Sequence, residues 1–350
     1  MAEPQIPEGG SPAAEEPSPD GPAASEPNST DKPDSPTTTE AAPTAPKQPT
    51  AAAKPAGPET PQEKKAREYI AQAEKKMKSS QTFLGGLFGG AAKMEDAADL
   101  YVRAANTYKV AKKWKDAGDA FCLAADVQMK LDVKHEAGSN LVEAGQVYKR
   151  EDPKRAVECY SQAAEIYTDM GRFTMAARYH SNIAEICESE LGDFEQAITH
   201  YEQAADYYKG EDSTGSANKC LLKVAHMAAM LQQFDKAAGI FEEVGRNSLE
   251  NSLLRYSAKD HFFKASICRF CMGVDNVKAS IEEYKQVHPG FEGTRELKLI
   301  QDLIEVHGEE DPDKFGDIVR DYDSISRIDP WLTAQLLVVK KSINAEPDIN

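Results

Sequence analysis

Two stretches of this 350-residue chain contain residue types that could bind a metal or a phosphate. Cys268-x-x-Cys271 has the spacing of two zinc-binding thiolates, and the sequence GGLFGG at residues 85–90 superficially resembles a phosphate-binding loop. However, the cysteine pair has neither a second pair nor a suitably spaced histidine. The glycines follow no predicted strand and precede no Lys-Ser/Thr. We therefore predict no metal site, and we expect Cys268 and Cys271 to be buried apolar thiols.

Motifs for catalysis are equally absent from the sequence. The chain has no Gly-x-Ser-x-Gly and no His-Glu-x-x-His, and its seven histidines are dispersed. His180 stands where a large core side chain is expected, so packing is its predicted role. The six cysteines are scattered without a secretory signal, which favours reduced thiols in a cytosolic protein. We predict a protein that is not an enzyme and needs no cofactor.

A repeat of about twenty residues indicates which elements make up the chain. Eight alanines follow one another at spacings of 20, 20, 19, 20, 21, 20 and 20 residues: Ala97, Ala117, Ala137, Ala156, Ala176, Ala197, Ala217 and Ala237. A larger side chain comes four residues after each alanine, and Ala or Gly comes eight residues after it. Offsets of four and eight lie on one face of an α-helix, so each unit predicts one helix with a small–large–small face.

The repeat predicts an all-α fold. Two units make a helical hairpin of about 40 residues, close to the period of tetratricopeptide solenoids. Turn residues such as Gly171 and Gly192 separate the units. We predict a TPR-like, right-handed superhelical solenoid of antiparallel hairpins, followed by a C-terminal helical bundle. Its helices are expected over residues 252–272, 275–287, 293–307, 314–325 and 331–343, the last starting at Asp329-Pro330.

Composition divides the chain into three segments. Residues 1–61 hold 15 of the 20 prolines and ten acidic against three basic residues, so we expect a disordered extension. Residues 62–250 are assigned to the solenoid and residues 251–350 to the bundle and its tail. No apolar run is long enough to span a membrane. The net charge of −17 argues against nucleic acid as a partner.

An apolar loop interrupts this pattern at residues 79–92. Phe83, Leu84, Leu87 and Phe88 lie between pairs of glycines, where a polar loop would be expected. One interpretation is that the loop folds back on the first helix pair. The other is a weak, reversible membrane contact, because partial burial of four such side chains in lipid is favourable.

Basic residues mark a second surface. Arg178 and Lys219 each follow a repeat alanine by two positions, on alternate helices, so they should project from one face of the solenoid. Five further residues are expected to extend this positive stripe: Lys112, Lys113, Arg150, Arg172 and Lys223. Such a stripe would steer and orient an acidic partner.

Several segments together resemble the soluble NSF attachment protein family. They are FLGGLFGG, EDAADLYVRAANTYK, EIYTDMGRFTMAARYH, SANKCLLKVA, YSAKDHFFKA and YDSISRIDPWL, in the order of the family from about residue 63 onward. The resemblance implies an adaptor that binds assembled SNARE four-helix bundles, containing syntaxin-like and partner SNAREs. It also implies recruitment of the hexameric AAA+ ATPase NSF, called Sec18 in yeast, which disassembles the bundle for vesicle fusion.

The resemblance also implies roles for particular residues. The apolar loop would contact membrane lipid, and Lys112, Arg178 and Lys219 match SNARE-contacting lysines of the family, with arginine in place of one lysine. The ATPase would contact acidic residues and the tail, here Glu305, Glu309, Glu310, Asp348 and Ile349, the last replacing a family leucine. The expected location is cytoplasmic and peripheral to membranes of the Golgi, ER, vesicles, vacuole or cell surface.

One alternative remains at this point. A tetratricopeptide scaffold or co-chaperone adaptor would bind peptide termini through Lys/Asn pairs at repeated positions. Asn218-Lys219 is one such pair, but the neighbouring repeats contain no matching pair.

Overall fold

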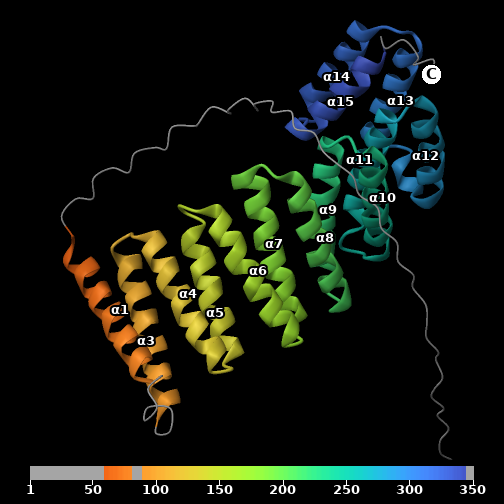
Figure 1. Cartoon of the computed structure of the whole chain (residues 1–350). Coiled ribbons are helices and arrows are strands. Elements are labelled where there is room, and N and C mark those ends of the chain that lie inside the picture. The colour runs from red at the N-terminus through yellow and green to blue at the C-terminus, as the bar shows by residue number, and fades with distance from the viewer. Residues whose placement is uncertain (1–58, 81–88, 344–350) are drawn as a thin grey trace, which may run out of the picture. The chain divides into compact units, whose positions relative to one another are not determined.

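The computed structural model describes residues 59–80 and 89–343, which form fourteen α-helices and no strand (Figure 1). The helices of the repeat region are α1 (Pro61–Ser80), α3 (Gly90–Val110), α4 (Trp114–Lys130), α5 (Lys134–Tyr148), α6 (Pro153–Asp169), α7 (Phe173–Ile186), α8 (Phe194–Gly210), α9 (Thr214–Met230) and α10 (Phe234–Glu250). The C-terminal helices are α11 (Ala258–Cys271), α12 (Val274–Val287), α13 (Arg295–Gly308), α14 (Pro312–Ile325) and α15 (Pro330–Ser342). All of them belong to one compact unit, Ala56–Asn350.

Successive helices of the repeat region pack side by side in antiparallel order (Figure 1). All eight repeat alanines are fully buried, and so are the large residues four positions later, from Tyr101 to Phe241. Small residues allow neighbouring helices to approach, and the large side chains fill the grooves between them. The all-α, TPR-like arrangement of hairpins predicted from the sequence is confirmed.

Turns between these helices share a left-handed residue at equivalent positions. Lys112, Asp132, Asp212 and Gln232 have φ between 52° and 60°, and Gly171 and Gly192 have φ of 67° and 65°. A left-handed residue ends a helix by redirecting the chain within one or two positions. The predicted turns at Gly171 and Gly192 are confirmed.

Tyrosines of the core pack directly on glycines of neighbouring helices. A Cβ atom at Gly118 would lie 2.5 Å from the ring of Tyr148, and one at Gly145 would lie 2.9 Å from the ring of Tyr160. These distances are too short for any side chain larger than hydrogen. The glycines are therefore required for the close approach of the aromatic rings.

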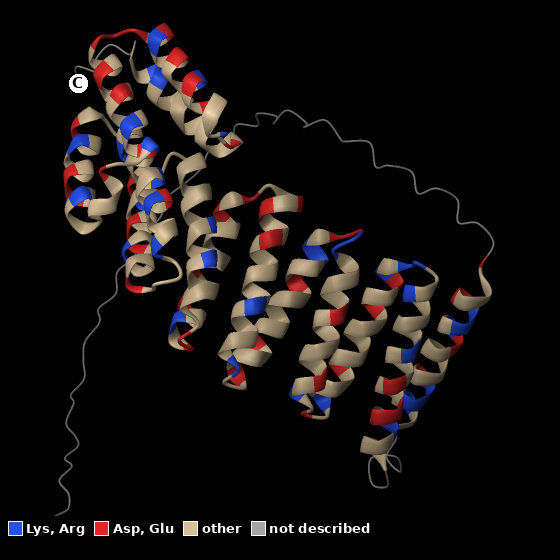
Figure 2. Ribbon diagram, turned by 180° about the vertical axis from the view of Figure 1, so that it is seen from behind, with Lys and Arg blue, Asp and Glu red and all other residues tan. Residues whose placement is uncertain are grey.

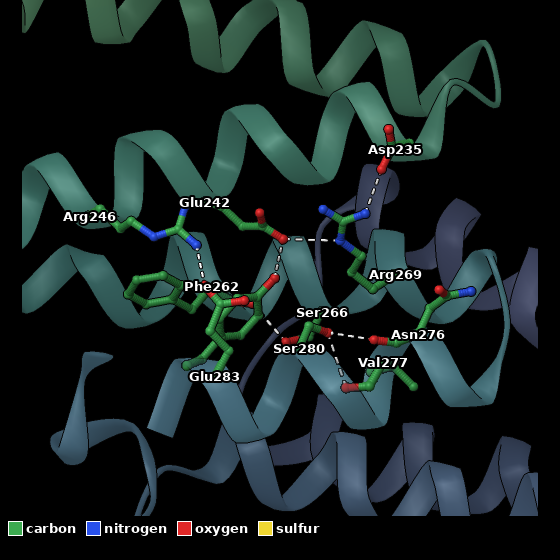
Figure 3. A network of polar contacts seen from close by, with 11 residues as sticks. Asp235, Glu242, Arg246, Phe262, Ser266, Arg269, Asn276, Val277, Ser280 and Glu283 are labelled. Carbon is green, nitrogen blue, oxygen red and sulfur yellow. Dashed lines mark hydrogen bonds and ion pairs between the residues drawn. The ribbon is translucent and has the colours of Figure 1, made fainter. Parts of the chain in front are cut away.

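The connection between α10 and the C-terminal helices contains a buried polar network (Figure 3). Arg269 of α11 donates hydrogen bonds to Glu242 at 3.0 Å and Asp235 at 2.5 Å, both on α10. Tyr284 of α12 donates to Glu242 at 2.5 Å. The side chains of Arg269 and Glu242 are only 21% and 11% exposed, so these charges are compensated by each other rather than by water.

Helix α15 is fixed at both its start and its core face. Asp329 caps it by accepting a hydrogen bond from the backbone N–H of Leu332, as predicted, and Pro330 occupies its first turn. Leu332, Leu336 and Val339 are buried. The indole N–H of Trp331 donates to the backbone oxygen of His226 at 3.0 Å, which ties α15 to α9.

Several predicted boundaries differ from the structure, and three of them are informative. Helix α1 already begins at Pro61, because Thr60 and Glu63 form a reciprocal capping box. Both ends of the segment predicted as a loop over 79–92 are helical, since α1 extends to Ser80 and α3 starts at Gly90, and residues 81–88 lie outside the described residues. The helix predicted from residue 252 starts only at Ala258, because extended backbone at Asn251 and a short 3₁₀ turn at Arg255–Ser257 precede it.

Candidate functional site

Arg178 and Lys219 lie on neighbouring parts of one surface. Both side chains are exposed. The residues directly before and after each of them, on α7 and on α9, are buried. Ser181, one turn after Arg178, lies 3.5 Å from the sulfur of Cys220, which follows Lys219. The two cations therefore emerge from the same side of this helix pair, and neither makes an ion pair with any residue in the described part of the chain.

The other predicted cations divide into two groups. Lys113 pairs with Glu63 at 2.8 Å, Lys223 pairs with Glu188 at 2.8 Å, and the guanidinium of Arg150 lies 4.4 Å from the centre of the Trp114 ring. Lys112 and Arg172 occupy interhelical turns and, within residues 59–80 and 89–343, have no ion-pair partner. Figure 2 shows acidic and basic residues interspersed along the helices, so an unpaired cation is the more distinctive feature.

Lys113 and Lys223 are less available to a binding partner because each forms an ion pair. The hydrogen bond from Lys113 holds the pKa of Glu63 at about 2, well below its usual range. Glu188 accepts hydrogen bonds from both Lys223 and the Tyr201 hydroxyl, at 2.8 and 3.1 Å. A partner would have to break these contacts before using Lys113 or Lys223, whereas Arg178 and Lys219 are available.

A groove adjoins Lys219. It has a volume of about 790 Å³ between α7, α8 and α9, and Trp331 of α15 contributes to its lining. Tyr208, Leu222 and Met230 are among its apolar lining residues, and Lys219 lies in its wall. Met230 is 52% exposed although it is apolar. An apolar groove with a cation at its side suits an amphipathic helical surface that carries acidic residues.

Sequence reasoning did not find this groove. Trp331 was expected only as a core residue of the last helix, and nothing in the sequence indicates that it lies beside His226, 105 positions earlier. The exposed apolar side chain of Met230 was a usable signal, because it belongs to the outward face of a repeat whose inward face was already assigned.

Acidic residues gather where α13 meets α14. Glu305, Glu309 and Glu310 are exposed, and Glu310 has a left-handed backbone with φ of 57°. Glu309 pairs with Lys314 at 2.5 Å. This hydrogen bond, followed by the charges of Glu309, Glu305 and Asp311, raises the pKa of Lys314. Because only one lysine lies among these carboxylates, the region where α13 meets α14 has a net negative charge.

Some predicted site residues lie outside the described residues. Phe83, Leu84, Leu87 and Phe88 fall within residues 81–88, and Asp348 and Ile349 fall within residues 344–350. The ends of the helices that flank the first segment are described. Lys75 and Lys78 are exposed in the last turns of α1, and the amine of Lys93 in α3 lies 3.5 Å from the carbonyl oxygen of Ser79.

The cysteine pair of the sequence motif is packed against α15. Cys268 is fully buried and Cys271 is half-buried, with its thiol 3.6 Å from the backbone oxygen of Gln335. Burial raises the pKa of Cys271 to about 12. Among the described residues, no group of three or more His, Cys, Asp or Glu is arranged to hold a metal ion. In the same part of the chain, no helix combines the length and apolarity needed to cross a membrane.

A family model matches nearly the whole described helical unit. The model described as soluble NSF attachment protein, SNAP, covers residues 64–344. The chain belongs to the soluble NSF attachment protein family. The match includes Lys112, Arg178, Lys219 and the acidic residues of α13 and α14.

Curated members of the soluble NSF attachment protein family support this assignment. The alpha-soluble NSF attachment protein of Homo sapiens is 52% identical over 286 residues, which cover 82% of this chain and 97% of that protein. The vesicular-fusion protein SEC17 of Komagataella phaffii is 36% identical over 288 residues, covering 81% of this chain and 97% of that protein.

Solved structures with helical repeats are more distant. A signal-transduction ATPase with a tetratricopeptide repeat sensor from Pyrococcus horikoshii is 15% identical, with a TM-score of 0.41. That similarity covers 81% of this chain and 46% of the other. It is too low to add to the argument.

Proposed function

We propose that this protein is an adaptor that binds assembled SNARE four-helix bundles and recruits an NSF-type AAA+ ATPase to disassemble them. The observation that carries the proposal is the family match over residues 64–344. Within this range Lys219 lies in the wall of an apolar groove and Arg178 is exposed on α7, both without an ion-pair partner among the described residues. A passive scaffold suits this task, because a stack of packed helices supplies an extended binding surface without bond chemistry of its own.

The SNARE-binding surface in this proposal is centred on Arg178 and Lys219. Lys112 and Arg172 would extend it along the turns, and Lys113, Arg150 and Lys223 would contribute less because their charges are already engaged. Unpaired cations attract the acidic exterior of a coiled bundle, while the groove beside Trp331 offers apolar contact. Charge would guide orientation, and apolar burial would slow dissociation.

Two further contacts are proposed from the family resemblance. The acidic end that contains Glu305, Glu309 and Glu310, together with Asp348 and Ile349, would contact the ATPase. Phe83, Leu84, Leu87 and Phe88 would touch the bilayer beside the SNARE membrane anchors. The protein would then act in the cytoplasm, peripherally bound to membranes of the secretory system, with neither nucleic acid nor a cofactor involved.

The alternative of a scaffold for peptide termini is not favoured. The family match and the 52% identity to an NSF attachment protein point to SNARE disassembly instead. In addition, Asn218 is buried, so the Asn218-Lys219 pair presents only the lysine to a partner.

Reconstituted disassembly tests the proposal. SNARE complexes are anchored in liposomes, or supplied without their membrane anchors, and incubated with an NSF-type ATPase hexamer and ATP. We expect disassembly of both substrates to require the chain. Phe83→Ser combined with Leu84→Ser should slow disassembly on liposomes about tenfold and leave the soluble substrate unaffected, because only the first offers lipid. Failure of the unaltered chain to support disassembly of either substrate would reject the adaptor function.

A further inference from the structure

Two cysteines from different helices lie in direct contact. The sulfur atoms of Cys122 in α4 and Cys159 in α6 are 3.6 Å apart. Cys122 is half-buried and reaches the surface, whereas Cys159 is 3% exposed. The two helices belong to successive hairpins, with α5 between them in sequence. An accessible thiol beside a buried one is the arrangement of a peroxide-reactive cysteine and its resolving partner.

The twenty-residue repeat explains this contact. Cys122 is five residues after Ala117, and Cys159 is three residues after Ala156, two units further along. The same offsets pair Ser181 of α7 with Cys220 of α9, whose side-chain oxygen and sulfur are 3.5 Å apart. The geometry of the repeat therefore produces the same contact in both pairs. Of the two, Cys122 and Cys159 form the pair in which both side chains are thiols.

Charged and polar groups surround the Cys122–Cys159 pair. Tyr148 of α5 donates a hydrogen bond to Asp119 at 2.5 Å, and the guanidinium of Arg155 lies 4.7 Å from the centre of the Tyr148 ring. Arg155 is also 3.4 Å from Asp119. The hydrogen bond with Cys159 is the main cause that lowers the pKa of Cys122, and the charge of Arg155 and a contact with Tyr148 act in the same direction, against the opposing effects of burial and of the Asp119 charge.

The remaining cysteines have the opposite environment. Burial raises the pKa of the four other thiols, on α9, on α11 and in the π-helical turn after α7: Cys187, Cys220, Cys268 and Cys271. Cys271 is the most informative comparison, because it is also half-buried but its thiol contacts the backbone oxygen of Gln335. Since the thiolate is the reactive species, Cys122 should react before the others.

We propose that Cys122 and Cys159 form a reversible, peroxide-sensitive disulfide site. The Cys122 thiolate attacks one oxygen of a hydroperoxide, the O–O bond breaks, and a sulfenic acid forms while water or an alcohol leaves. The Cys159 thiol then attacks the sulfenic sulfur, the S–S bond forms, and a second water leaves. The two thiols together lose two electrons and two protons, and the peroxide is reduced. Nothing in this inference depends on the adaptor function.

The disulfide would link the hairpins that contain α4 and α6. The sulfur atoms have to move from 3.6 Å to a bond length of about 2.05 Å, which side-chain rotation with a small helix shift can supply. Oxidation would thus restrict the relative motion of two successive repeats, on helices other than those that carry Arg178 and Lys219.

Peptide mapping after limited oxidation tests the proposal. The reduced full-length chain is treated with less than one equivalent of hydrogen peroxide, free thiols are alkylated, and peptides are analysed by mass spectrometry without reduction. We expect a Cys122–Cys159 cross-link as the first product, reversible by dithiothreitol. Cys159→Ser should instead accumulate a Cys122 sulfenic acid that dimedone traps. The control Cys271→Ser should leave the cross-link unchanged. Oxidation of any other cysteine before Cys122, or no cross-link, would overturn the proposal.

A second variant tests whether a short distance between two side chains is enough for disulfide formation, or whether the neighbouring side chains also contribute. Ser181→Cys places a thiol at the equivalent repeat position, 3.5 Å from Cys220 in the present side-chain arrangement. Tyr208 occupies the position equivalent to Tyr148 and interacts with Ser181 and Cys220, but Ser216 stands where Arg155 stands in the first pair, and burial raises the pKa of Cys220. This new pair should therefore cross-link about tenfold more slowly than Cys122–Cys159. An equal or faster rate would contradict the assigned role of the charged surroundings.

Discussion

The repeat region and its junction with the C-terminal helices are stabilised differently. From α3 to α9 most buried positions are alanine, glycine, aromatic and aliphatic residues, and the few buried polar side chains, such as Gln128, Asn140 and Asn218, are uncharged. Each helix packs mainly on its neighbours in sequence. At the junction, the buried residues include Glu242, and Arg269 reaches across from α11 to pair with it. Helix α15 returns from the end of the chain to contact α9 and α11.

This difference has a functional consequence. In the repeat region the core is satisfied by apolar contacts, so exposed cations such as Arg178 and Lys219 are not needed to hold helices together. At the junction, by contrast, a cation and a carboxylate are structural. A charged pair therefore stabilises the fold at the junction, whereas we propose that unpaired cations serve binding in the repeat region.

The largest expected effect is the loss of the junction pair. Arg269→Met removes the cation and leaves Glu242 buried with a single neutral donor, Tyr284. We expect the free energy of unfolding to fall by about 3–5 kcal/mol, measured by urea denaturation with circular dichroism. The matched control Arg246→Met removes an exposed pair with Glu283 and should cost less than about 1 kcal/mol. Equal effects of the two variants would show that the junction is not held by buried charge.

A smaller effect concerns His180, the one histidine at a large position of the repeat. His180 stacks on Tyr207, and its ring nitrogen lies 3.1 Å from that of His200. Burial, and then the charge of His200, lowers the pKa of His180 from 6.5 to about 4. Below pH 6.5 the unfolded chain binds a proton that the folded chain rejects until about pH 4, so stability falls as the pH decreases through this window.

The corresponding variant is His180→Phe, which retains an aromatic ring and removes the titration. The unaltered chain should lose about 1–2 kcal/mol more stability than the variant when the pH is lowered from 7 to 5, measured by urea denaturation at each pH. Parallel stability curves for the two proteins would mean that His180 is protonated in the folded state, contrary to its burial.

The sequence predicted the repeat region well because its signal is local. A single alanine period placed eight helices and their buried faces, and the offset of two placed Arg178 and Lys219 on one side. The start of α1 was predicted one residue too late, at residue 62, although Thr60 and Glu63 have the spacing of a capping box.

Features that depend on distant residues were not predictable in this way. Lys113 is neutralised by Glu63 and Lys223 by Glu188, at separations of 50 and 35 positions along the chain, so neither was recognised as engaged. The groove requires Trp331 beside α9, and the junction requires Glu242 to be inside rather than outside. A helical period assigns each residue to one face of its helix, but it does not identify the residues of a later helix that pack against that face.

The central claim is that the unpaired cations of α7 and α9 bind the assembled SNARE bundle. The direct measurement is the affinity of Arg178→Glu combined with Lys219→Glu for a soluble SNARE four-helix bundle, at physiological ionic strength. The control is Lys130→Glu combined with Lys154→Glu, an equal charge change at exposed positions of α4 and α6 that have no ion-pair partner among the described residues. We predict binding at least about tenfold weaker for the first variant, unchanged binding for the control, and the same thermal stability for both. Equal affinity of the two variants would contradict the account.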